Sequence, residues 1–265
     1  MGLNKTRAAR LFAGVLVFGV CALTAPRAYA ADEEIQVYMD EIGPTGKIGL
    51  DVHVNDAIDG RRTQSYPGEQ ISDNRIRITP EFSYALNSMF ELGAYLPLAT
   101  IDRDGDARVS GAKLRLKFVA PHDADQGLFW GANFEIGRVN KSLDINPWNA
   151  ELKGIIGTRT GPWTLAANAN IDWAVSGPAT GPTTLEIATK ASYAINPRLS
   201  VGLESYNDFG PIRDFTAFSD GDQKIYAVLD TALGDWDFDF GVGYGYGQPE
   251  DRWILKMIVG VPLGR

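Results

Sequence analysis

The strongest constraint on this chain is an alternation of apolar and polar residues that returns in one segment after another. Residues 112–118, AKLRLKF, put four apolar residues on one face and three cations on the other. Successive side chains of a β-strand point to opposite faces, so a period of two predicts a strand with one apolar and one polar face. We predict twelve such strands, at residues 48–55, 74–86, 89–97, 108–120, 128–138, 148–158, 163–175, 184–194, 199–206, 224–233, 236–245 and 252–262.

The lengths of the connections alternate as well. Long connections cover residues 56–73, 98–107, 139–147, 176–183, 207–223 and 246–251. Tight turns fall between them at residues 87–88, 160–162, 196–198 and 234–235, and residues 121–127 form a connection of medium length. Long loops on one side and short turns on the other are typical of an outer-membrane barrel, and an even strand number puts both chain ends on the short-turn, periplasmic side.

The composition of the two faces distinguishes a membrane barrel from the alternative, a soluble β-sandwich or lipocalin-like barrel. Charged residues lie in the middle of the polar face, which a packed core excludes and a wet lumen accepts. The predicted fold is therefore all-β, an antiparallel up-and-down transmembrane barrel with Leu116, Ala167 and Leu229 toward lipid and Asn168 toward the lumen. Aromatic residues of the apolar face gather near the strand ends, as in membrane girdles. They are Tyr84, Phe90, Phe118, Trp130, Trp163, Tyr193 and Trp236 at the short turns, and Trp148, Trp173, Tyr244 and Trp253 at the long loops.

The first thirty residues predict a secretory signal peptide. Three bases precede an uncharged apolar run at residues 11–23, and Ala28-Tyr29-Ala30 forms a small-residue cleavage site. This leader holds four bases and no acid, so its removal takes the net charge from −8 to −12 and also removes the single cysteine. An acidic, cysteine-free product excludes thiol chemistry and argues against binding of nucleic acid.

The expected organisation is a signal peptide at residues 1–30, an N-terminal periplasmic segment at 31–47 and a barrel at 48–265. Residues 34–40 alternate too, but a thirteenth spanning strand would break the even strand number. We predict a short periplasmic strand there, or a piece of chain inserted in the barrel.

Several stretches resemble a family of uncharacterised proteobacterial outer-membrane β-barrel proteins. They are IQVYMDEIGPTGKIGLDVHVN at 35–55, RITPEFSYAL at 77–86, FELGAYLPL at 90–98, GAKLRLKF at 111–118 and DRWILKMI at 251–258. The resemblance implies a barrel in the outer membrane of a Gram-negative bacterium, and it supplies no substrate and no catalytic residue. Partners expected of such a barrel are outer-membrane lipids, lipopolysaccharide and the barrel assembly machinery.

Charges predicted to face the lumen fall into two groups on different strands. A basic wall comprises Arg75, Arg77, Lys113, Arg115 and Lys117, and an acidic wall comprises Glu186, Glu204, Asp230, Asp237 and Asp239. Two hypotheses remain open. The walls face each other across an aqueous path, or they pair directly and fill a narrow interior.

Candidate chemistry rests on the two histidines, because a lipid hydrolase would need a Ser–His pair. His53 is predicted to face the lumen as a hydrogen-bonded structural residue, and His122 is expected in solvent beside Asp123 and Asp125. We expect no catalytic residue, no metal site and no cofactor. The favoured function is passage or binding of a small polar or zwitterionic solute. The alternatives are a non-conducting structural or envelope-maintenance barrel with a salt-bridged lumen and, third, a lipid-modifying enzyme.

Overall fold

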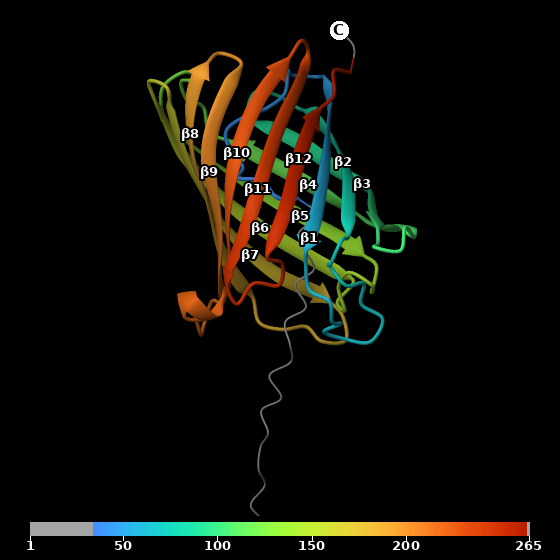
Figure 1. Ribbon diagram of the computed structural model, residues 1–265. Helices are drawn as coiled ribbons and strands as arrows, with labels where there is room; N and C mark the ends of the chain where they lie inside the picture. The colour runs from blue at the N-terminus through green and yellow to red at the C-terminus, as the bar shows by residue number, and fades with distance from the viewer. Residues whose placement is uncertain (1–33, 264–265) are drawn as a thin grey trace, which may run out of the picture.

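The computed structural model describes residues 34–263, which form one closed barrel of twelve antiparallel strands (Figure 1). Each strand pairs with its neighbours in the chain, and β1 pairs with β12 to close the sheet. All twelve predicted strands are confirmed, with ends that differ by a few residues. Their bounds are β1 Ile48–Asp59, β2 Ile76–Ala85, β3 Phe90–Ile101, β4 Ala107–Val119, β5 Gly127–Val139, β6 Trp148–Thr160, β7 Trp163–Ser176, β8 Thr184–Asn196, β9 Leu199–Pro211, β10 Asp222–Leu233, β11 Trp236–Gly247 and β12 Trp253–Gly260.

Between Ile48 and Gly260 four of the five connections at one end of the barrel are tight turns, and the β4–β5 connection at residues 120–126 is the exception; the longest connections, at residues 60–75 and 212–221, lie at the other end. The β6–β7 and β10–β11 hairpins turn in two residues each, and both turns place a glycine at positive φ, Gly161 at 57° and Gly234 at 69°. Left-handed backbone of this kind is what tight hairpins require. In Figure 1 the β8–β9 and β10–β11 turns lie at the same end as the C-terminus, called here the short-turn end; the opposite end is the long-loop end. The long-loop end carries a single turn of 3₁₀ helix, η1 Phe218–Asp220.

The outward face of the barrel is apolar and exposed. Leu114 is 62% exposed and Leu203 is 54% exposed. Five tryptophans are exposed as well: Trp130, Trp148, Trp163, Trp236 and Trp253. An apolar belt of this size is unlike the surface of a soluble protein and matches the lipid-facing band of a membrane barrel. Leu116 and Leu229 lie on this face, as predicted, whereas Asn168 is buried in the lumen. Among the described residues, no helix is long and apolar enough to cross a membrane.

The N-terminal segment adopts the second of its two predicted forms, a piece of chain inserted in the barrel. Residues 34–47 form no strand, so the short strand predicted there is wrong. A closed barrel has no free edge to which a thirteenth strand could pair. Residues 34–43, called here the inner segment, instead run inside the barrel and turn at residues 44–47 into β1 (Figure 1). The predicted signal peptide at residues 1–30 lies outside the described residues.

Candidate functional site

The lumen is the candidate site, because it collects the buried charged side chains of the barrel. The basic wall is divided along the axis. Arg77 and Lys113 line a cavity at the long-loop end, whereas Arg115 and Lys117 line one at the short-turn end. Arg75, just before β2, is buried and donates to the backbone oxygen of Gln70. The five predicted cations are therefore not brought together into one surface.

The two cations at the short-turn end have different partners. Arg115 on β4 pairs with Glu91 on β3 at 2.9 Å and with Glu81 on β2. Lys117 donates to the backbone oxygen of Glu41 at 2.8 Å. Buried charges are stabilised when they are paired, which accounts for the burial of Arg115, whereas Lys117 gains a hydrogen bond to a backbone oxygen.

Three members of the acidic wall do meet. Glu204 on β9, Asp230 on β10 and Asp239 on β11 surround Lys190 of β8, at 3.2, 3.1 and 3.4 Å. Lys256 of β12 completes the cluster, at 2.6 Å from Glu204 and 3.2 Å from Asp239. Glu186 lies apart at the long-loop end, and Asp237 is exposed at the short-turn end.

Lys256 is a buried lumen cation that was not among the predicted wall residues. Its position on the inward face of the last strand follows from the alternation with Trp253 and Leu255, so the signal was present in the sequence. Arg115 of the basic wall pairs with Glu81 and Glu91, and Lys190 and Lys256 pair with three acids of the acidic wall, so part of each wall's charge is balanced by neighbouring strands.

The inner segment occupies the centre of the lumen, and Tyr38 anchors it. The Tyr38 backbone N–H donates to Asn168 Oδ1 at 2.6 Å, and Asn168 Nδ2 donates back to the Tyr38 oxygen at 2.9 Å. The Tyr38 hydroxyl bonds to the hydroxyl of Tyr95 and donates to Glu135 Oε1 at 3.3 Å. No local sequence pattern marks Tyr38, because its partners lie on strands distant in the chain.

Cations also face the ring of Tyr38. Lys153 Nζ lies 4.2 Å from the ring centroid, Lys117 Nζ lies 5.2 Å from it, and the Arg115 guanidinium lies 5.7 Å from it. Such contacts are worth more when they are shielded from water, as they are in this lumen. The ring therefore offsets part of the repulsion among three cations.

Apolar contacts hold the upstream part of the inner segment. Ile35 and Val37 are buried against inward apolar side chains of the barrel, among them Phe129, Ile155 and Ile254. Burying an aliphatic side chain of this kind contributes about 1.5–3 kcal/mol. Lys256 Nζ also donates to the Ile35 oxygen at 3.2 Å.

At the short-turn end, Asp40 joins the inner segment to two basic side chains. Arg159 donates to both carboxylate oxygens of Asp40, at 2.5 and 2.6 Å, and His122 Nε2 lies 2.6 Å from Oδ2. Burial opposes ionisation of Asp40, but the hydrogen bonds from Arg159 and His122 hold the pKa of Asp40 below its usual value. The expectation that His122 lies free in solvent is wrong. Its bonds to the Ala120 oxygen and to Asp40 raise the pKa of His122.

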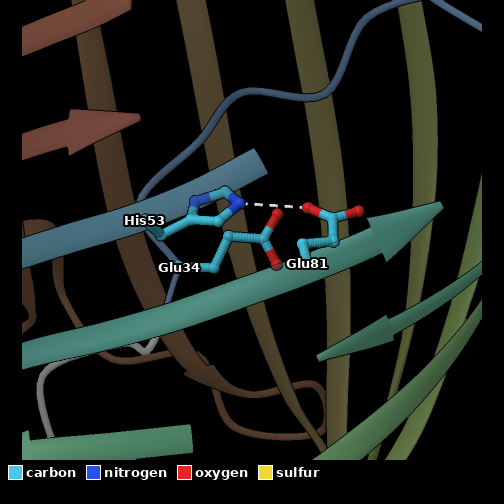
Figure 2. A group of neighbouring side chains, drawn as sticks. All are labelled: Glu34, His53 and Glu81. Atoms are coloured by element: carbon cyan, nitrogen blue, oxygen red, sulfur yellow. Dashed lines mark hydrogen bonds and ion pairs between the residues drawn. The ribbon is translucent and has the colours of Figure 1, made fainter. Parts of the chain in front are cut away.

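His53 lies deep in the lumen beside two carboxylates. Figure 2 shows the carboxylate of Glu34 below the His53–Glu81 hydrogen bond, in which Nε2 lies 3.0 Å from Glu81 Oε2. Ligand atoms of Glu34, His53 and Glu81 lie within 4.8 Å of one another, a spacing that a metal ion could bridge. Glu81 already pairs with Arg115 and His53, so the group contains its own counter-charges. We interpret His53 as a hydrogen-bonded structural residue, as predicted.

Two polar cavities enter the lumen. The cavity at the long-loop end has a volume of about 600 Å³, and the cavity at the short-turn end has a volume of about 700 Å³. Gln36 of the inner segment lines both. The inner segment therefore lies between two spaces that open toward opposite ends of the barrel.

Comparison with known proteins identifies the fold. No family model and no curated protein sequence matches this chain. An outer-membrane channel from Pseudomonas putida F1 superposes with a TM-score of 0.57 at 12% identity, over 86% of this chain and 99% of that one. The KdgM porin in complex with disordered oligogalacturonate gives 0.52 at 9% identity, over 82% and 100%. The NanC porin gives 0.50 at 11% identity, over 81% and 100%. The chain thus has the fold of outer-membrane porin-type barrels.

Proposed function

We propose that this protein is an outer-membrane barrel that passes or binds small polar or zwitterionic solutes in its lumen. The observation that carries the proposal is the pair of polar cavities that reach Gln36 from opposite ends. A barrel closed on all sides by hydrogen-bonded strands, apolar outside and charged inside, is the form that lets polar molecules cross a lipid bilayer.

The location follows from the same surface. The exposed apolar belt would contact outer-membrane lipids and lipopolysaccharide, and assembly would depend on the barrel assembly machinery. Outer-membrane barrels place short turns in the periplasm and long loops outside. The short-turn end would then face the periplasm, after export and cleavage of the predicted signal peptide.

The side chains and the inner segment that occupy the lumen limit the size of the solute. The inner segment and the Lys190–Lys256 cluster occupy the centre of the barrel, so the remaining path suits small molecules. Both signs of charge line each cavity, which suits solutes that carry hydrogen-bonding or charged groups.

Single-channel recording on the folded barrel in planar bilayers tests the proposal, together with swelling of proteoliposomes in amino acids or small sugars. We expect small, discrete conductance steps and swelling that falls steeply with solute size. A barrel that neither conducts nor admits any polar solute would instead support the structural, envelope-maintenance function.

A further inference from the structure

The cavity at the long-loop end is strongly acidic. Its lining among the described residues includes ten Asp or Glu side chains and four Lys or Arg side chains. The acids come from many elements, including Asp172 on β7, Glu186 on β8, Asp208 on β9 and Asp251 before β12. Carboxylates therefore surround the cavity and are not confined to one wall.

Two of the four cations are bound to carboxylates of their own strands. Lys153 Nζ lies 3.1 Å from Glu151 on β6, and Lys224 Nζ lies 2.7 Å from Asp222 on β10. These pairs cancel locally, which leaves eight acids and two cations in the lining, so the excess of negative charge persists even when Glu250 is protonated. Low-dielectric walls focus such a field along the axis of a narrow cavity.

Buried acceptors in the same lining lack donors. Asn170 is 5% exposed, and its Nδ2 donates to Glu186 at 2.9 Å; within residues 34–263 its Oδ1 has no hydrogen-bond partner. Asp251 is 1% exposed and accepts from Arg61 N through Oδ1, whereas no described residue donates to Oδ2. A buried acceptor without a donor is costly, so a solute that brings N–H groups would be stabilised at these atoms.

The lining of the cavity at the short-turn end also has an excess of acidic side chains. Eight Asp or Glu and four Lys or Arg side chains line it within the described chain. A solute that enters from either end therefore meets a negative potential before it reaches the inner segment.

From this lining we infer that the barrel selects small organic cations that carry ammonium or guanidinium groups. The inference rests on the proposed function and specifies its solute class. Rings of Asp and Glu make pores cation-selective, and N–H donors match the unpaired acceptors of Asn170 and Asp251.

The first test is the reversal potential of the barrel in a KCl gradient across a planar bilayer. We expect a preference for K⁺ over Cl⁻. Asp172→Asn combined with Glu186→Gln should lower that preference roughly two- to threefold, because it removes two charges within a Debye length of the path. Asp104→Asn with Asp106→Asn is the matched control; these exposed acids lie in the β3–β4 loop, outside the cavity lining, and their loss should leave the preference unchanged.

The second test uses a diamine and a dicarboxylate of similar length. We expect 1,4-diaminobutane to block the K⁺ current from the long-loop side and glutarate to leave it unchanged. An anion preference, or block by glutarate alone, would overturn the inference while the channel function stands.

A barrel without conductance would refute the channel function but still allow a test of the solute class. Calorimetric titration of 1,4-diaminobutane into the detergent-folded barrel should show binding that weakens in the double variant of Asp172 and Glu186. Absence of binding there would refute the inference as well.

Discussion

At the scale of single residues, Tyr38 couples the inner segment to the barrel. Its backbone pairs with Asn168, its hydroxyl meets Tyr95 and Glu135, and its ring faces Lys153. The three side-chain contacts come from different strands, so loss of the Tyr38 side chain should loosen the segment on several sides while the backbone pairing with Asn168 remains.

Tyr38→Ala should therefore raise the conductance of the barrel severalfold. Truncation of a large buried aromatic side chain costs about 3–5 kcal/mol. The inner segment would then leave its packed position more often and widen the path. Single-channel current and its fluctuations measure this effect.

Tyr38→Phe is the matched control, because it keeps the ring over Lys153 and removes only the hydroxyl. Tyr38→Phe should lower the free energy of unfolding by about 1–3 kcal/mol, because the hydroxyl bonds are lost while the packing of the ring stays. Identical conductance in parent and Tyr38→Ala would show that the inner segment does not limit the path.

Glu250, in the loop between β11 and β12, should make ion selectivity depend on pH. Burial raises its pKa to about 8, and nearby Asp222 and Asp251 add to the shift, while Arg61 opposes it. Because Glu250 lines the cavity at the long-loop end, its deprotonation adds a negative charge there. The preference for K⁺ should rise between pH 7 and pH 9 and should lose this step in Glu250→Gln.

The contribution of Glu250 to folding stability changes with pH in the opposite direction to the K⁺ preference. A carboxyl whose pKa is higher in the folded barrel than in the unfolded chain favours folding at low pH, and this contribution is lost as pH rises through about 8.

A preference for K⁺ that stays constant between pH 7 and pH 9 in the parent would contradict the assignment of Glu250.

At the scale of the strand, the two faces impose different tolerances. Asn168, predicted to face the lumen, is 1% exposed and binds both backbone groups of Tyr38. An arginine there would break these bonds, so Asn168→Arg should destabilise the folded barrel even though the position faces the lumen. The lumen is filled at this depth.

Leu116 on β4 provides a test of the outer face. It is exposed, and Leu116→Arg should destabilise the folded barrel by about 2–4 kcal/mol if the position lies near the bilayer midplane. Leu116→Phe keeps the face apolar and should cost less than about 1.5 kcal/mol. Urea titrations of the barrel in lipid vesicles compare the two, and equal penalties would argue against contact with lipid.

At the scale of the whole molecule, orientation in the membrane follows from the two ends of the barrel. A cysteine at Ser219, exposed in the long β9–β10 connection, should react with an impermeant maleimide on intact cells. Cysteines at Asn87 and Asn196, exposed at the short-turn end, should react only after the outer membrane is opened. The reverse pattern would invert the topology.

The sequence by itself determined the twelve strands, their tight turns and the apolar outer face. Strand alternation is a local property, and turn signals such as Gly161-Pro162 lie within a few residues of the strands they join. An even strand number with alternating loop lengths then leaves an up-and-down barrel as the simplest closure. The same alternation also predicts that Lys256 faces the lumen.

Only the tertiary structure decided what fills the lumen. The Tyr38–Asn168 pairing spans 130 residues, and the contacts of Lys190 with Asp230 and Asp239 cross strands that do not pair directly. Side chains inside a barrel meet across its diameter, and their distances depend on closure, stagger and the course of the inner segment. Period-two alternation says which face a residue occupies but carries no information on which residues meet across the barrel, so the partial neutralisation of each wall and the two acidic cavities emerged only when the sheet closed.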